Sequence, residues 1–208
     1  MTTVRVRQHV NPLSQKYQTP LAGLNWPHYY ANLQQPLHLD IGCARGKFLL
    51  DLAQVHPEWN FLGIEIREPL VEQANLLRDR LGLTNLHYVF ANANASLRSL
   101  CEPGSLAGVF IQFPDPWFKR RQHKRRLVQP ELVADLAVCI RSGGFVFLQS
   151  DVLKMAQQMR DRFAKQPEFV DPAIGQWLET NPLNVPTERE IFTLEQGQPV
   201  YRSWLIRN

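Results

Sequence analysis

The chain has 208 residues, of which 44% are hydrophobic and 20% charged, so a full core can form and a disordered chain is excluded. No apolar run approaches the ~20 residues that cross a bilayer. The N-terminus lacks the apolar segment of a signal peptide. The three cysteines are scattered and have no metal-ligand spacing, which predicts reduced thiols in a cytoplasmic protein without a metal.

The net charge of +4 is unevenly distributed along the chain. Residues 119–126 hold six of the 23 Lys and Arg, and the remaining 17 face 19 Asp and Glu, a net charge of −2. A patch of this density attracts a polyanion, first of all nucleic acid. A solvated loop or helix face is the alternative interpretation.

Strands and helices are predicted to alternate after a polar, irregular arm at residues 1–35. Strands are predicted at 37–41, 60–65, 86–90, 106–113 and 145–148, of which the first reads as buried and the fourth as strongly apolar. Helices are predicted at 47–53, 68–81, 96–101, 129–140 and 152–166. This alternation predicts one α/β domain over 36–208 with a mostly parallel sheet. At the C-terminus, 191–194 and 200–206 read as two strands joined around Gly197.

A small-residue loop follows the first predicted strand and reads Asp40-Ile41-Gly42-Cys43-Ala44-Arg45-Gly46. Such residues let the backbone approach a ligand closely. The second predicted strand ends at Glu65, 23 residues after Gly42, where a carboxylate can accept hydrogen bonds from ribose hydroxyls. Ligands of open parallel sheets bind at this edge, so the sequence predicts a nucleoside site there.

The loop departs from the dinucleotide pattern Gly-x-Gly-x-x-Gly. The carboxylate of Asp40 would repel a pyrophosphate but suits the cationic methionine end of S-adenosylmethionine. A methyl donor is therefore favoured over NAD, and a tight turn without a ligand is the alternative. Asn92, after the third predicted strand, could bond an adenine edge through its amide.

The loop after the fourth predicted strand reads Phe113-Pro114-Asp115-Pro116-Trp117-Phe118-Lys119. Its two prolines hold Asp115 in a fixed orientation. Trp117 and Phe118 can stack on a base, an interaction of ~1–3 kcal/mol, although a buried corner is the alternative for Trp117. Since the basic run follows at once, the loop leads directly into a predicted phosphate-binding segment.

These motifs together resemble the bacterial tRNA (guanine-N7-)-methyltransferases over nearly the whole chain. The matching segments are residues 5–12, 40–42, 63–65, 113–117 with the basic tail to Arg126, and Thr187 with Glu190. The resemblance implies a class I S-adenosylmethionine-dependent methyltransferase fold. This fold has a mostly parallel seven-stranded sheet, helices on both faces and an antiparallel C-terminal strand pair. The implied reaction methylates N7 of a guanosine in the tRNA variable loop.

The resemblance also implies roles for individual residues. Cofactor contacts fall on Asp40, Glu65, Asn92 and Asp115, with Gly42 in the same loop, and Asp115 is also the catalytic candidate. Substrate contacts fall on Lys119, Asp151, Thr187 and Glu190, to which the basic run adds Arg121, His123, Lys124, Arg125 and Arg126. Three positions depart from the family pattern, namely Ala44 in place of Gly, Asn92 in place of Asp, and Arg189 in place of an aromatic residue.

Guanine N7 carries a free lone pair and no proton, so its methylation needs alignment rather than a general base. Asp115 could stabilise the moving positive charge or accept hydrogen bonds from guanine N1–H and N2–H. Asp151 and Glu190 are alternatives for that recognition. The expected partners are tRNA and the methyl donor, with neither a membrane nor an obligate protein partner. Two rival hypotheses are a methyltransferase for another substrate and a non-catalytic tRNA-binding protein.

Overall fold

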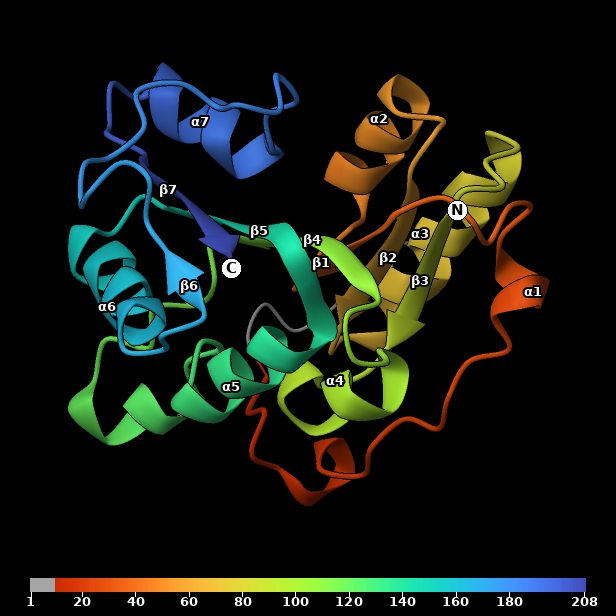
Figure 1. The fold of residues 1–208 in the computed structure, drawn as a ribbon, viewed down its shortest axis with the longest axis horizontal. Helices are drawn as coiled ribbons and strands as arrows, with labels where there is room; N and C mark the ends of the chain where they lie inside the picture. Colours follow the sequence, from red (N-terminus) through yellow and green to blue (C-terminus); the bar gives the residue numbers. More distant parts are fainter. Residues whose placement is uncertain (1–9) are drawn as a thin grey trace.

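The computed structural model describes residues 10–208, which form a seven-stranded sheet between two layers of helices (Figure 1). The strand order is β3-β2-β1-β4-β5-β7-β6. β1 to β5 are parallel, whereas β7 is antiparallel to both β5 and β6. The predicted mostly parallel sheet with an antiparallel C-terminal pair is confirmed. The strands are β1 Leu37–Ile41, β2 Asn60–Glu65, β3 Leu86–Phe90, β4 Leu106–Gln112, β5 Ile140–Ser150, β6 Phe169–Val170 and β7 Tyr201–Arg207.

Helices cover both faces of this sheet. The buried side chains of α4, α5 and α6 form one hydrophobic cluster, and those of α2 and α3 form a second on the opposite face. Within the described residues, no helix is long and apolar enough to cross a membrane. The α-helices are α1 Trp26–Tyr29, α2 Lys47–Val55, α3 Glu68–Arg80, α4 Ala93–Leu100, α5 Pro130–Cys139, α6 Leu153–Ala164 and α7 Glu188–Glu195.

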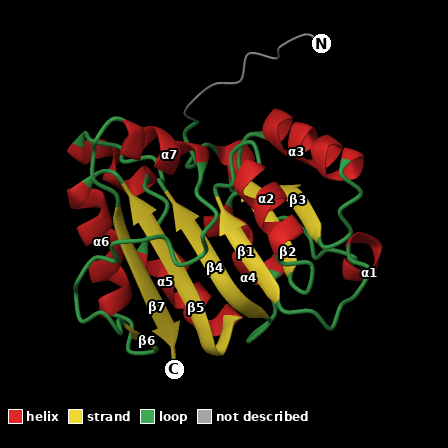
Figure 2. Cartoon of the chain, turned by 90° about the horizontal axis from the view of Figure 1, so that it is seen from above, coloured by secondary structure: helices red, strands yellow, loops and turns green. Residues whose placement is uncertain are grey.

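The parallel strands bring their carboxyl ends to one edge of the sheet, as Figure 2 shows for β1, β4 and β5. The strand order reverses between β1 and β4, because β2 and β3 lie on one side of this pair and β5 on the other. Ligands of open α/β sheets bind at such a switch point. A ligand-binding site is therefore expected at the carboxyl edge next to β1 and β4.

The C-terminal prediction was wrong at one element, because residues 191–194 lie in helix α7 and not in a strand. Thr187 caps this helix, its Oγ1 accepting a hydrogen bond from the Glu190 N–H at 3.0 Å. A Thr followed three residues later by Glu is the capping-box pattern, which outweighs the β-branched residues that suggested a strand. The antiparallel partner of β7 on its outer side is instead β6, a two-residue strand that was not predicted from the sequence.

The segment before the sheet, residues 10–35, packs along β2, β3 and α4. Tyr30 is buried and its hydroxyl donates to the Phe61 carbonyl at 2.9 Å. The Ala31 N–H donates to the Thr84 carbonyl at 3.1 Å. The predicted arm over 1–35 and domain over 36–208 stay a prediction, and the motif residues Arg5 to His9 lie outside the described residues.

Candidate active site

The loop after β1 turns sharply at its glycines. Gly42 and Gly46 have φ of +84° and +76°, the left-handed region that glycine adopts without strain. A Cβ at Gly46 would also lie 2.6 Å from the ring of Tyr88, whose hydroxyl donates to the Gly46 carbonyl at 2.6 Å. Ala44, between the two glycines, has φ of +51° and carries the strain that glycine would avoid. The loop backbone is thereby held at the end of β1.

Two carboxylates, Asp40 and Glu65, are buried side by side at the ends of β1 and β2. Burial, and then the charge of Glu65, raise the pKa of Asp40 to about 8. Negative charge concentrated in a low-dielectric place favours a cation. The chemistry of this pair fits the cationic end of S-adenosylmethionine, as the sequence predicted.

Glu65 is held in place by main-chain and side-chain donors. Its carboxylate accepts from the Ala44 N–H at 2.9 Å and from Nε and Nη2 of Arg67 at 2.9 and 3.0 Å. Glu65, followed by Asp115, also raises the pKa of Arg67. Arg67 was not among the residues predicted from the sequence, although an arginine two residues after the strand-end carboxylate was a visible signal. This guanidinium links the candidate ribose-binding carboxylate to the candidate catalytic one.

The loop after β4 is strained at two non-glycine residues. Phe113 and Trp117 have φ of +48° and +42°. The Phe113 N–H donates to the Gln149 carbonyl at 2.8 Å, which fixes the start of the loop against β5. Asp115 lies between them on the surface. Such backbone strain persists only where the surroundings impose it, and it gathers at functional sites.

Asn92 lies at the expected strand end, but its amide is bonded within the protein. Its Oδ1 accepts from the Asn94 N–H at 3.2 Å and caps α4. Its Nδ2 donates to the carbonyls of Pro12 and Tyr17 at 3.2 and 3.1 Å. The predicted adenine contact stays a prediction, and it requires these bonds to open.

The basic run forms a 3₁₀-helix, η2 Arg120–Arg125, whose charges divide into two sets. Lys119, Arg121 and Lys124 are exposed, and His123 is half-buried. Arg126 instead turns inward, with Nε donating to the Pro116 carbonyl at 2.7 Å and Nη1 to Gln158 at 2.7 Å. Arg125 lies over the ring of Trp117 at 5.1 Å. One set faces solvent, and the other supports the loop that carries Asp115.

A buried polar network lies where α7 meets β5 and β7. Glu190 forms a buried ion pair with Arg202, with Oε1 to Nη2 at 2.8 Å. Its Oε2 accepts from Gln149 Nε2 at 3.1 Å and from Asn181 Nδ2 at 2.9 Å. Both carboxylate oxygens of Glu190 are thus engaged. Arg202 and Gln149 were not predicted from the sequence, because they meet Glu190 only through the pairing of β5 with β7 and the packing of α7.

Asp151 follows β5 at the same edge and is partly buried. Its Oδ2 accepts from Nε of Arg189 at 2.9 Å. Arg189, which stands where the family has an aromatic residue, therefore forms an ion pair with Asp151. Asp40, Glu65, Asp115 and Asp151 all follow or end neighbouring strands of one sheet edge.

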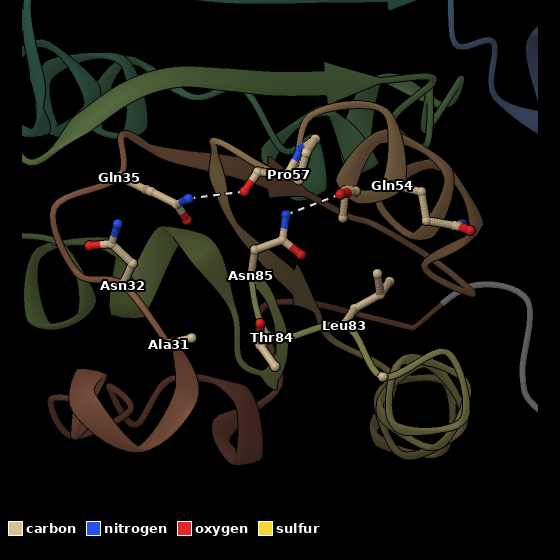
Figure 3. Close-up of a pocket in the computed structure, with 10 residues that line it drawn as sticks. Ala31, Asn32, Gln35, Gln54, Pro57, Leu83, Thr84 and Asn85 are labelled. Atoms are coloured by element: carbon tan, nitrogen blue, oxygen red, sulfur yellow. Dashed lines mark hydrogen bonds between the residues drawn. The ribbon is translucent and has the colours of Figure 1, made fainter.

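A cavity of about 390 Å³ lies at the opposite, amino edge (Figure 3). It is lined by residues that precede or follow the strand starts, among them Gln35, Pro57 and Asn85. The amides of Gln35 and Asn85 donate to main-chain carbonyls, to Pro57 at 2.9 Å and to Ala53 at 3.0 Å. None of the described residues that line it is charged, and its lining amides are engaged with the main chain.

Solved structures with this fold include several methyltransferases. The chain is similar to the 16S rRNA methyltransferase KamB with a TM-score of 0.62 and 15% identity, over 99% of this chain and 97% of that chain. It is also similar to the [4+2]-cyclase SpnF, with a TM-score of 0.58 and 11% identity over 88% and 78% of the two chains. These likenesses show the fold alone. A family model described as "Putative methyltransferase" matches residues 34–203, and fold and family model together define a methyltransferase of class I.

Relatives at much higher identity narrow this class. A protein named tRNA (guanine-N(7)-)-methyltransferase in Trichormus variabilis is 60% identical over 207 residues, which cover 98% of this chain and 96% of that protein. One with the same name in a Synechocystis strain is 56% identical over 209 residues, with 100% and 99% covered. The chain belongs to the family of tRNA (guanine-N(7)-)-methyltransferases.

Proposed function

We propose that this protein transfers a methyl group from S-adenosylmethionine to N7 of a guanosine in the variable loop of tRNA. The observation that carries the proposal is the arrangement at one sheet edge. The buried pair Asp40 and Glu65 lies at one end of it, and the strained Asp115 loop joins the exposed basic helix at the other. The names of the relatives support tRNA as the substrate.

Asp40, Gly42 and Glu65 are the residues to hold the donor. Glu65 accepts hydrogen bonds from ribose hydroxyls, and Asp40 faces positive charge, which would lower its raised pKa. The glycine turn brings backbone N–H groups close without a Cβ in the way. When bound, S-adenosylmethionine supplies a methyl group activated by its cationic sulfur.

The chain's own residues then align the base and balance charge. Guanine N7 has no proton to lose, so none of these side chains needs to act as a general base. Alignment of reactants can supply ~7–11 kcal/mol of the barrier. Asp115 stabilises positive charge as it develops on the purine, and the strained loop holds its carboxylate there. Asp151 and Thr187 lie at the same edge as further substrate contacts.

The exposed part of the basic helix holds phosphates of the RNA. Lys119, Arg121 and Lys124 face solvent beside the loop, so they can meet a backbone that passes the site. The exposed Phe118 offers a ring on which a base can stack. We place the protein in the cytoplasm, where tRNA is present, and we expect it to act without an obligate protein partner.

Incubation of the purified protein with an unmodified tRNA transcript and S-adenosylmethionine tests the proposal. Mass analysis of the digested RNA should show one 7-methylguanosine per tRNA. A transcript with adenosine at the variable-loop position and the Asp115→Asn variant serve as controls, and both should yield almost none. Methylation at another base or atom would refute the proposal.

A further inference from the structure

We propose that the side-chain amide of Gln112 recognises O6 of the target guanine, an inference that rests on the function proposed above. Gln112 ends β4 and precedes Asp115 by three residues. Its neighbour across the sheet is Gln149 of β5. Both side chains therefore stand at the sheet edge where the acceptor base must be methylated.

A chain of hydrogen bonds fixes which way the Gln112 amide points. Arg202 has only donors, and its Nε donates to Oε1 of Gln149 at 3.2 Å. Gln149 must therefore present Nε2 on its other side, where it donates to Oε1 of Gln112 at 2.8 Å. Because the Oε1 of Gln112 is used in this bond, its Nε2 is the atom that can donate to a ligand.

That nitrogen is buried and has no acceptor among the described residues. A buried donor without a partner is costly, and native proteins keep few of them. The unsatisfied donor destabilises the protein without RNA, and a hydrogen bond from Nε2 to an acceptor on the RNA removes this destabilisation. Because Gln149 is fully buried and already bonded to Glu190, the network cannot turn Gln112 to satisfy itself.

Guanine offers an acceptor at the required place. O6 and N7 lie next to each other on one edge of guanine, whereas adenine presents an amino donor in the position of O6. A fixed N–H beside the methylated atom thus accepts guanine and opposes adenine. Glu190 and Arg202 are positioning residues, since they act on the base only through Gln149 and Gln112.

The test compares three tRNA transcripts that carry guanosine, inosine or 2-aminopurine at the target position. Inosine keeps O6, and 2-aminopurine lacks it. Gln112→Met preserves the length of the side chain and removes the N–H. It should lower kcat/KM about 10- to 100-fold on guanosine and inosine alike, and it should leave the slower reaction with 2-aminopurine unchanged.

Two more variants separate recognition from stability. Gln149→Met lies too deep to touch RNA, yet it should reproduce the same base pattern at smaller size because it releases Gln112. Thr193→Val is the matched control, since Thr193 on α7 also has a buried side-chain oxygen with no partner in the part of the chain that the structure describes. It should change neither kcat/KM nor the preference among the three bases, whatever it does to Tm.

Equal losses on all three bases, or no loss on guanosine, would overturn the assignment of Gln112. If Gln112→Met does not fold, the wild-type protein is tested on a transcript with 6-thioguanosine at the target position. Sulfur is a weaker acceptor than oxygen, so the rate should be lower than with guanosine. A rate equal to that with guanosine would again overturn it. Failure of the wild-type protein to methylate guanosine itself would refute the proposed function, and the inference with it.

Discussion

At the amino edge of the sheet, the amides of Gln35, Asn60 and Asn85 donate to main-chain carbonyls at 2.7 to 3.0 Å. At the carboxyl edge, by contrast, Asp40 shares a buried space with a second carboxylate. There too, Gln112 presents a donor that has no acceptor within residues 10–208. The amino edge has a cavity of about 390 Å³, but the amide donors of Gln35 and Asn85 in its lining already bond main-chain carbonyls.

This difference shows that backbone strain and buried like charges indicate the site better than the volume of a cavity does. Ala44, Phe113 and Trp117, all with positive φ, lie in loops at the carboxyl edge. Strain and repelling charge reduce stability, so they persist where binding or catalysis uses them. Among the described residues, no non-glycine residue with positive φ lies in the loops at the amino edge. Changes at the carboxyl edge should therefore affect reaction and binding more than folding.

Asp115→Asn should give the largest effect, a fall in kcat of about 100- to 1,000-fold. Asn keeps the shape and removes the charge, so the loss arises in the transition state and not in binding. Steady-state kinetics with tRNA in excess measure kcat, and a filter-binding assay checks that tRNA affinity is retained. Unimpaired kcat would show that Asp115 only supports its loop.

Glu65→Ala should weaken binding of S-adenosylmethionine by about 10- to 150-fold, because hydrogen bonds to a charged acceptor contribute ~1.5–3 kcal/mol. tRNA affinity should remain nearly intact. Glu65→Gln is the matched control, since it can still accept from the Ala44 N–H while losing the charge that Arg67 balances. Calorimetry that shows unchanged donor affinity in Glu65→Ala would remove Glu65 from the site.

Local patterns predicted much of the carboxyl edge. The mostly apolar runs at 60–65 and 86–90 match β2 and β3, because strands of a parallel sheet covered by helices are rich in apolar residues. The edge positions of Asp40 and Glu65 followed from the ends of such strands. Helix α7 was missed, although the Thr187 and Glu190 spacing carried its cap.

Contacts between distant residues could not be predicted. The ion pair of Glu190 joins α7 to β7, and the amide of Asn92 bonds Pro12, 80 residues earlier in the chain. Nothing in a local window shows that these side chains face inward. The same holds for Arg126, which supports the Asp115 loop whereas Lys119, Arg121 and Lys124 of the same run are exposed.

The raised pKa of Asp40 predicts a pH dependence at the carboxyl edge. The folded protein holds this proton more tightly than the unfolded chain, so its contribution to the free energy of unfolding falls as pH rises from about 4 to about 8. Donor binding should show the opposite trend, since a cation favours ionised Asp40. We expect affinity to rise by at most about tenfold from pH 7 to pH 8.

Calorimetry in two buffers of different ionisation enthalpy should detect proton release on donor binding below pH 8. Asp40→Asn isolates the effect, because the amino group of the donor titrates with both proteins. The variant should lose the part of the pH dependence that belongs to Asp40. An identical profile for the two proteins would mean that Asp40 does not meet the donor's charge.

The smallest effect should divide the basic helix itself into a part that binds RNA and a part that supports the loop. Arg121→Gln with Lys124→Gln removes two exposed charges and should flatten the plot of log K against log salt by about 0.7–0.9 for each lost phosphate contact. Phosphate contacts carry no base information, so all tRNAs should lose affinity alike. Tm and donor affinity should not change.

Arg126→Gln is the matched variant, because it removes one charge from the same run but also the hydrogen bonds to Pro116 and Gln158. It should lower Tm and kcat while leaving the salt slope nearly as in the wild-type protein. A salt titration of tRNA binding, with a thermal melt of each variant, measures both quantities. If Arg126→Gln flattened the slope as much per charge as the exposed pair, its inward hydrogen bonds would not hold it away from the RNA. If the exposed pair lowered Tm and left the slope unchanged, the helix would serve the fold and the RNA would pass elsewhere.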